Sequence, residues 1–337
     1  MVAEHDEDAA VHLLSVVVPV YQGERHLAAL TAEIAAYTKV SSSPAGHLFR
    51  VAELLLVDDH ARDGSPRVIR ELVDQYDVVR GIWLSRNFGQ HAATLAGMAS
   101  SGSDWIVTMD EDGQHDPSYF GALLDTALEQ GATVVYAEPT NTPFHSTFRN
   151  LTSRGSKRLV KLFSGGIDAS VFHSYRLILG EVGRSVAAYA GAGVYLDVAL
   201  SWVAPTPAQT RVELRPEGGD RASGYSKRAL ISHFWRLMLS SGTRALRIVS
   251  VLGIVFALVG FGFALYLVIS RLAGAPLVQG WTSLIVVVLL CTGVVLFSLG
   301  VIAEYVGVAV NMAMGKPLYL ITGDPAEGPL GRRAPRR

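Results

Sequence analysis

Carboxylates crowd one short stretch of the chain, from Asp110 to Asp116. The stretch reads Asp-Glu-Asp-Gly-Gln-His-Asp, and it directly follows an apolar run over 105–109 that predicts a β-strand. Carboxylates this close repel one another unless a cation lies among them. Mg²⁺ or Mn²⁺ at a nucleotide is usually held by one or two carboxylates, with diphosphate oxygens and water completing the shell. We therefore predict that Asp110 and Asp112 hold such an ion. The competing interpretation is an acidic turn that only starts a helix at Pro117.

Two other apolar runs, over 14–20 and 51–57, also end in polar residues. Together they supply a proline, an aromatic ring and three carboxylates: Pro19, Tyr21, Glu24, Asp58 and Asp59. A carboxylate can accept hydrogen bonds from a base N–H or a ribose hydroxyl. Each cluster alone could serve only to cap the following helix, but three at one sheet edge would line a crevice of nucleotide size.

The elements that must position these residues alternate along the first half of the chain. Short β-branched runs predict strands at 14–20, 51–57, 79–84, 105–109 and 133–136, and helices are expected at 25–37, 66–76, 90–101 and 118–129. This order is typical of an α/β fold with a mostly parallel sheet covered on both faces. Ligands of such sheets bind beyond the carboxyl ends of the strands, which is where the carboxylates fall.

Two long apolar runs, at 248–270 and 281–303, lie near the end of the chain. Neither contains a charged residue, and each exceeds the ~20 residues that cross a bilayer as a helix. Basic residues gather before the first run and after the second, so the positive-inside bias places both ends in the cytosol. We expect two transmembrane helices, preceded by an amphipathic interfacial helix at 229–247. Two buried helices of a soluble core are the competing interpretation.

Composition excludes several classes of protein. The net charge of -1, without a long basic run, argues against nucleic acid as a partner. A single cysteine, Cys291, excludes a disulfide framework and a cysteine-rich metal site. The N-terminus is acidic and lacks a secretory signal, so the first domain is expected in the cytosol. The first strand leads to Tyr21-Gln22-Gly23 without a G-x-G-x-x-G turn, which argues against a nicotinamide-dependent dehydrogenase.

These motifs resemble those of family-2 glycosyltransferases with the GT-A fold, in the polyisoprenyl-phosphate glycosyltransferase branch that includes dolichyl-phosphate mannose synthases. Residues 19–24 resemble the family's P-V-Y-N-E first loop, and 58–65 its D-D-x-S-x-D-G second loop. Residues 84–89 resemble the next loop, and 110–114 match D-x-D-x-Q, the most specific of these signals. The resemblance runs from Leu13 to Leu320.

The resemblance implies a role for each matching residue. Catalysis would fall to Asp112 and Arg176, and the metal to Asp110 and Asp112 with Gln114 assisting. Donor binding would involve Pro19, Tyr21, Glu24, Asp58, Asp59, Arg86, Asp110 and Glu111, and the acceptor phosphate would meet Arg221, Ser226 and Lys227. Asp197 lies in an apolar stretch. We interpret it as a structural residue in preference to a residue that contacts the sugar.

The implied organisation has five parts: a disordered N-terminus (1–12), a GT-A domain (13–228), the juxtamembrane helix (229–247), two transmembrane helices within 248–303 and a cytosolic tail (304–337). The tail after Thr322 is expected to be a flexible polar segment. The protein would be integral to the membrane, in bacteria the plasma membrane, with the catalytic domain and both termini cytosolic. Gly253, Gly260 and Gly262 would allow the spans to pack in a homo-oligomer.

The implied function is inverting transfer of a single sugar from a nucleotide-sugar donor to a polyprenyl phosphate. Two alternatives stay open: a glycosyltransferase acting on another membrane lipid or on a polysaccharide, and a non-catalytic, membrane-tethered nucleotide-sugar binding protein. A processive polysaccharide synthase would carry a Q-x-x-R-W element and more membrane helices, and only 233–236 comes near that element. The identity of the sugar, its nucleotide and the length of the lipid depends on pocket shape.

Overall fold

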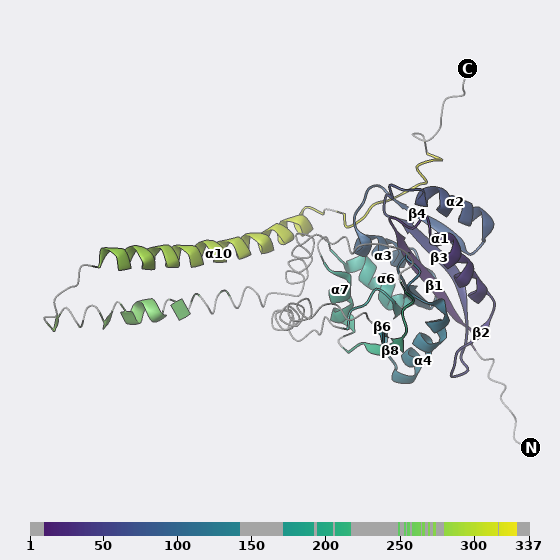
Figure 1. The fold of residues 1–337 in the computed structure, drawn as a ribbon, viewed down its shortest axis with the longest axis horizontal. Helices are drawn as coiled ribbons and strands as arrows, with labels where there is room; N and C mark the ends of the chain where they lie inside the picture. Colours follow the sequence, from purple (N-terminus) through teal and green to yellow (C-terminus); the bar gives the residue numbers. More distant parts are fainter. Residues whose placement is uncertain are drawn as a thin grey trace, which may run out of the picture.

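A computed structural model describes residues 10–141, 171–191, 194–204, 206–216, 280–315 and 317–328, with scattered positions between 249 and 273. Figure 1 shows an α/β domain from which one long helix, α10, projects. The last described segment returns from the end of that helix to the edge of the domain.

A single sheet forms the centre of the domain, with strand order β8-β6-β7-β5-β1-β3-β4-β9 and β2 paired to β3. Its strands are β1 (His12–Val20), β2 (Ser41–Ser42), β3 (Leu48–Asp58), β4 (Val79–Leu84), β5 (Trp105–Thr108), β6 (Val134–Pro139), β7 (Arg176–Leu179), β8 (Ala208–Val212) and β9 (Ile321–Thr322). The four strands β5, β1, β3 and β4 are adjacent and parallel, so their carboxyl ends meet at one edge.

Helices cover both faces of the sheet. They are α1 (Leu27–Ala35), α2 (Ser65–Gln75), α3 (Gln90–Ala99), α4 (Phe120–Gln130), α6 (Gly180–Tyr189) and α7 (Leu196–Val203), with short 3₁₀ turns η1 (Ala36–Thr38) and η2 (Pro117–Tyr119). In β1, Val16 and Val18 enter the core under α1, α2 and α4, whereas Val17 enters the core under α3, α6 and α7. This alternation is the period-two pattern of a strand buried on both faces.

The elements predicted from the sequence are confirmed for the first half of the chain. All five expected strands and all four expected helices are present, and β4 begins and ends at the predicted residues. The sheet is mostly parallel, as expected, but β7 runs antiparallel to both β5 and β6. Four short strands, β2, β7, β8 and β9, were not expected, because runs this short leave no distinct periodicity.

The long helix α10 spans Trp281–Ala313, ten residues beyond the predicted end at 303. Within it, Leu290–Val310 is long and apolar enough to cross a membrane. Its large side chains are exposed, with Leu296 at 63% and Phe297 at 60%, whereas a core helix would be buried. The other predicted span, 248–270, is described only at scattered positions, so the two-helix hairpin stays a prediction. The juxtamembrane helix at 229–247 lies outside the described residues.

Both chain ends differ from the expected organisation. His12, assigned to the disordered N-terminus, opens β1, while residues 1–9 lie outside the described part. The expected cytosolic tail, 304–337, contains β9, which pairs antiparallel with Trp83 and Leu84 of β4. Asp324, in the part expected to be flexible after Thr322, makes an ion pair with Arg70 of α2. The sequence did not predict the pairing of β9 with β4 or the Arg70–Asp324 ion pair, because partners more than 200 residues apart leave no local pattern.

Candidate functional site

Four loops leave the carboxyl ends of the adjacent parallel strands and form one polar edge. They are the first loop (21–26, after β1), the second loop (59–64, after β3), the third loop (85–89, after β4) and the fourth loop (109–116, after β5). Every residue that was predicted to bind the sugar-nucleotide donor lies in one of these loops or at the end of the strand before it.

Glu111 joins the first and fourth loops. Its Oε2 accepts a hydrogen bond from the backbone N–H of Tyr21 at 2.9 Å, and its Oε1 accepts one from Gln22 at 3.0 Å. A Cβ at Gly23 would lie 2.6 Å from the same carboxylate, so a larger residue there would displace Glu111 from this position. The resemblance assigns Glu111 to the donor, but in the structure this carboxylate positions the loop that carries Tyr21.

Glu24 joins the first and second loops in a similar way. Its Oε2 accepts a hydrogen bond from the backbone N–H of Gly64 at 3.0 Å, and Gly23 donates to Ser65 Oγ at 2.9 Å. A Cβ at Gly64 would lie 2.1 Å from the Glu24 carboxylate, so a larger residue there would displace Glu24. The two loops therefore form one interlocked unit.

Asp59 joins the second and third loops. Its side chain is buried and accepts hydrogen bonds from the backbone N–H groups of Phe88 at 2.7 Å and Gly89 at 2.8 Å. Burial raises the pKa of Asp59, and the two hydrogen bonds oppose that rise. In the third loop, the Arg86 guanidinium lies 4.2 Å from the centre of the Phe88 ring. Asp59 thus fixes the backbone from which Arg86 projects.

Asp58, at the end of β3, has fewer partners than its neighbour. It is 4% exposed, and its Oδ1 accepts one hydrogen bond, from the Ala61 backbone N–H at 3.1 Å. Burial raises the pKa of Asp58 to about 6, and the Ala61 hydrogen bond only partly offsets this. Among the described residues no hydrogen bond reaches Oδ2, so this oxygen can accept one from a ligand. His60, which follows, has a left-handed φ of 57°, a conformation that histidine tolerates better than most residues.

Asp110 is held by side chains from two other elements. Its Oδ1 accepts a hydrogen bond from Gln90 Nε2 at 2.5 Å, and its Oδ2 accepts one from Ser174 Oγ at 2.6 Å. The Asp110 backbone N–H donates to His115 Nδ1 at 2.9 Å. Its side chain stays 29% exposed. These bonds fix the orientation of the carboxylate and leave it accessible from the loop edge.

Asp112 lies two residues further along the fourth loop, and its Oδ1 accepts a hydrogen bond from the Gln114 backbone N–H at 3.0 Å. No group of three or more His, Cys, Asp and Glu residues suited to a metal occurs in the described part of the chain. A closed protein cage for a metal is therefore not formed by these residues. Asp110 and Asp112 instead fit the open arrangement, in which two carboxylates hold Mg²⁺ or Mn²⁺ and a bound diphosphate supplies further oxygens.

Arg176, to which the resemblance assigns a catalytic role, lies in the buried part of the domain. Its side chain is 3% exposed and forms a buried ion pair with Asp197, which also accepts a hydrogen bond from Tyr136 Oη at 2.9 Å. Burial lowers the pKa of Arg176, but the Asp197 carboxylate more than compensates, and the net pKa is raised. This arrangement agrees with the structural interpretation of Asp197.

Arg176 still connects to the acidic loop through a chain of hydrogen bonds. Its Nε donates to Thr108 Oγ1 at 2.9 Å, and Thr108 Oγ1 donates to the carbonyl of Ser174 at 2.7 Å. Ser174 Oγ in turn donates to Asp110. Arg176 is therefore linked to the Asp110 carboxylate through hydrogen bonds of Thr108 and Ser174.

Arg215 is a positioning residue that the sequence did not reveal. Its guanidinium lies 3.0 Å from Asp116 Oδ2 and 2.6 Å from Glu33 Oε2, so it ties the fourth loop to α1. Burial raises the pKa of Asp116, but hydrogen bonds from Ser118 and Arg215 outweigh it and the net pKa is lowered. The partners of Arg215 are 99 and 182 residues away, a separation at which no motif spacing exists.

The predicted acceptor residues Arg221, Ser226 and Lys227 lie outside the described residues, so their role stays a prediction.

Comparisons with known proteins agree on one family. Residues 15–180 match Glycosyl transferase family 2. The undecaprenyl-phosphate 4-deoxy-4-formamido-L-arabinose transferase of Pseudomonas paraeruginosa is 32% identical, over 92% of this chain and 90% of the relative. The protein of the same name from Aeromonas hydrophila subsp. hydrophila is 30% identical, over 92% of this chain and 93% of its own.

Among solved structures, glucosyl-3-phosphoglycerate synthase from Mycobacterium tuberculosis aligns with a TM-score of 0.48 and 15% identity, over 69% of this chain and 79% of that one.

Proposed function

Because the chain belongs to glycosyl transferase family 2, we propose that it transfers a single sugar from a nucleotide-sugar to a polyprenyl phosphate, with inversion at the anomeric carbon. The observation that carries the proposal is the interlocked loop edge, where Asp58, Asp110 and Asp112 lie at or just beyond the carboxyl ends of parallel strands. Relatives that match nearly their whole length are named as undecaprenyl-phosphate sugar transferases, which supports a polyprenyl phosphate as acceptor.

The donor half of the site takes the nucleotide across the first three loops. Asp58 Oδ2 accepts a hydrogen bond from a base N–H or a ribose hydroxyl. Tyr21 supplies an aromatic ring on a loop that Glu111 holds in place, and Pro19 shapes the strand end before it. Arg86, which projects from the third loop, supplies a cation for the diphosphate. Glu24 and Asp59 act as positioning residues, since their carboxylates bind the loop backbones.

Asp110 and Asp112 would hold the divalent ion, with Gln114 assisting from the same loop. The ion, when bound, supplies charge that stabilises the departing nucleoside diphosphate. Gln90 and Ser174 orient the Asp110 carboxylate, and Arg176 supports Ser174 through Thr108. In this proposal Arg176 is thus a positioning residue, because its guanidinium is buried against Asp197.

The acceptor brings its own nucleophile. A phosphate monoester has a second pKa near 6 and is mostly dianionic at pH 7, so its oxygen attacks without a strong general base. In-line attack on the face opposite the leaving diphosphate inverts the configuration of the sugar. Arg221, Ser226 and Lys227 are proposed to bind the acceptor phosphate, since arginine offers a bidentate fork and lysine a compact charge.

The membrane is the surface on which the acceptor resides, and α10 is proposed to span it. The exposed apolar side chains of Leu290–Val310 support this assignment. A second span at 248–270 would return the chain to the same side, which places the catalytic domain and both termini in the cytosol.

A donor panel tests the function. Purified full-length protein is mixed with undecaprenyl phosphate and radiolabelled UDP-glucose, UDP-N-acetylglucosamine, GDP-mannose or UDP-4-deoxy-4-formamido-L-arabinose, and lipid-linked label is released by mild acid. We expect one donor to label the lipid in a form that mild acid releases. Label in a diacylglycerol lipid or in polymer would favour the other acceptors, and donor binding without transfer would favour a non-catalytic binding protein.

A further inference from the structure

The segment 317–328 returns from the end of α10 to the catalytic domain and forms its edge. Figure 1 shows this segment running along the β4 side of the sheet after leaving the long helix. Its β9 pairs antiparallel with β4, Ile321 opposite Leu84 and Thr322 opposite Trp83. The chain that leaves the proposed membrane helix therefore becomes part of the sheet that carries the donor loops.

The same segment contacts the third loop at its first residue. Ser85 donates its backbone N–H to the carbonyl of Leu320 at 3.0 Å. Leu318 and Tyr319 pack against the same hydrophobic cluster as Phe88, and that cluster includes Leu84. The third loop is thus bounded on one side by Asp59, which binds its backbone at Phe88, and on the other by the returning segment.

A charge pair fastens the far end of the segment. Arg70 of α2 donates from Nε to Asp324 Oδ2 at 2.6 Å and from Nη2 to Asp324 Oδ1 at 2.7 Å, a bidentate geometry. The Asp324 side chain is 11% exposed, and the Arg70 guanidinium also lies 4.8 Å from the centre of the Trp83 ring. The hydrogen bond from Arg70 lowers the pKa of Asp324, which therefore stays charged at neutral pH.

A strand of two residues is too short to hold this arrangement by backbone pairing alone. Each net hydrogen bond contributes no more free energy than is lost as conformational entropy when one residue is ordered. The fork between Arg70 and Asp324 adds a partly buried, charge-assisted contact at the point where the segment would otherwise separate from α2. Because Arg70 also stacks on Trp83 of β4, the pair fixes the segment relative to the strand that leads into the third loop.

We propose that residues 317–328 form a strap that holds the third loop in its donor-binding position and ties it to the end of α10, with Arg70 and Asp324 as positioning residues. This inference rests on the proposed function, because it assigns the third loop and its Arg86 to the donor. The strap joins the end of the proposed membrane helix to the third loop. Neither Arg70 nor Asp324 contacts the reacting atoms.

The test uses Asp324→Ala and Arg70→Ala in the full-length protein, with Glu71→Gln as the matched control. Glu71 also pairs with an arginine of α2, Arg67, but both of these side chains are well exposed and neither belongs to the Arg70–Asp324 pair. With the donor that wild type uses from the panel above, we expect the strap variants to raise donor KM roughly three- to tenfold, while kcat and acceptor KM change less. The control should match wild type. Unchanged donor KM in both strap variants overturns the proposal.

Two further measurements separate positioning from general destabilisation and from failure of the proposed function. The swapped pair Arg70→Asp with Asp324→Arg should return the donor KM most of the way to the wild-type value. A donor KM as high as in the single variants would contradict the strap. Hydrogen exchange needs no substrate: the amides of residues 85–89 should exchange faster in Asp324→Ala than in wild type or Glu71→Gln. Equal exchange overturns the strap even if transfer is found, and faster exchange with no transfer by wild type overturns only the proposed function.

Discussion

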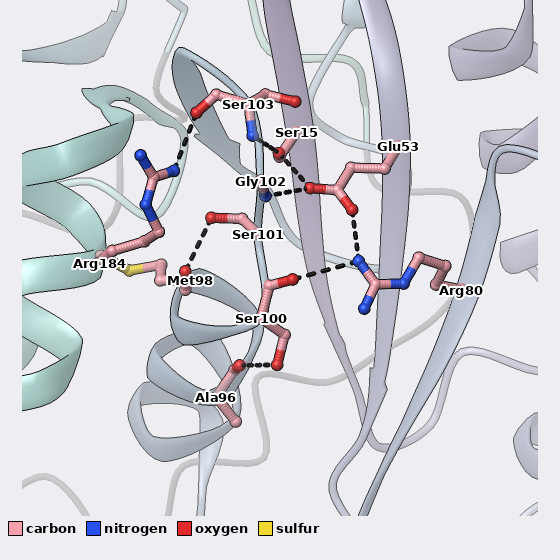
Figure 2. Close-up of polar contacts among 10 residues, drawn as sticks. All are labelled: Ser15, Glu53, Arg80, Ala96, Met98, Ser100, Ser101, Gly102, Ser103 and Arg184. Atoms are coloured by element: carbon pink, nitrogen blue, oxygen red, sulfur yellow. Dashed lines mark hydrogen bonds and ion pairs between the residues drawn. The ribbon is translucent and has the colours of Figure 1, made fainter.

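One strand carries two carboxylates with opposite settings, Glu53 near the amino end of the sheet and Asp58 at its carboxyl end. Glu53 accepts hydrogen bonds from Ser15 Oγ at 2.6 Å, from the Gly102 backbone N–H at 2.5 Å and from Arg80 at 2.5 Å (Figure 2). Asp58 accepts one, from the backbone of Ala61. Both are members of β3.

The difference lies in the number of protein donors. Burial raises the pKa of Glu53, but its three hydrogen bonds and the Arg80 charge outweigh this, so the net pKa is lowered. At Asp58 burial dominates and the pKa rises to about 6. The amino end therefore uses its carboxylate to hold the chain, because Glu53 binds the segment that enters β5. At the carboxyl end, Asp58 keeps an oxygen that can accept a hydrogen bond from a ligand, and its burial in the ionised form lowers the stability of the fold.

The largest expected effect is on turnover at the carboxyl end. Changing Asp112→Asn removes one of the two carboxylates proposed to hold the metal and should lower kcat by about two to three orders of magnitude. The fold should stay intact, because within the described residues Asp112 makes only a local hydrogen bond to the Gln114 backbone. Transfer of labelled sugar to undecaprenyl phosphate measures the loss. Asp74→Asn, an exposed acid on α2, is the matched control. Near-normal turnover at saturating metal would remove Asp112 from the site.

At the amino end the expected effect is on stability. Changing Glu53→Ala leaves the Gly102 N–H and the Ser15 hydroxyl without their acceptor and should cost about 1–3 kcal/mol of unfolding free energy. Thermal unfolding would measure this as a lower midpoint. At a temperature where the variant is folded, kcat and donor KM should match wild type. A loss of turnover as large as that of Asp112→Asn would show that the two ends do not divide their roles.

The smallest effect is a pH dependence of donor binding at Asp58. Only its ionised form leaves both oxygens as acceptors, so donor affinity should rise several-fold between pH 5 and 7, through the pKa of about 6. Equilibrium binding without acceptor avoids titration of the lipid phosphate. Asp58→Asn should give a flat profile, and an unchanged profile in that variant would assign the titration to another group.

The stability linked to Asp58 has the opposite sign. Its pKa in the folded chain lies above the ordinary value, so the folded state binds more protons than the unfolded state between about pH 4 and 6. The contribution of Asp58 to unfolding free energy therefore falls as pH rises through that window. Asp58→Asn should unfold at a higher temperature than wild type at pH 7, and the difference should shrink towards pH 4.

The parts of the fold that the sequence predicted are those with local patterns. The run at 79–84 was predicted as a strand and is β4 without change, since Val79 and the apolar residues 82–84 form a short run that is followed by polar loop residues. The strand β7 was missed because four residues show no period, and its antiparallel position depends on contacts with β5 and β6. The pairing of β9 with β4 joins residues almost 240 positions apart.

For the site, the sequence located the carboxylates, but it did not separate those that bind loop backbones from those proposed to bind a ligand. Asp58 and Asp59 are adjacent in sequence and are the same type of residue, yet Asp59 accepts hydrogen bonds from the backbone of the third loop. Glu111 lies between Asp110 and Asp112 and turns to the first loop. Such roles depend on which N–H groups lie within 3 Å, and that is set by packing between loops. The spacing of residues along the chain therefore does not predict which N–H groups each carboxylate binds.

Metal removal tests the central claim, that the acidic fourth loop is the donor half of a metal-dependent transferase. Full-length protein is stripped with excess EDTA, and transfer of labelled sugar to undecaprenyl phosphate is measured before and after Mg²⁺ or Mn²⁺ is restored. We expect transfer to cease on stripping and to return with metal in wild type, and to return only at much higher metal concentration, or not at all, in Asp112→Asn. Full transfer by the stripped wild-type protein would contradict the account.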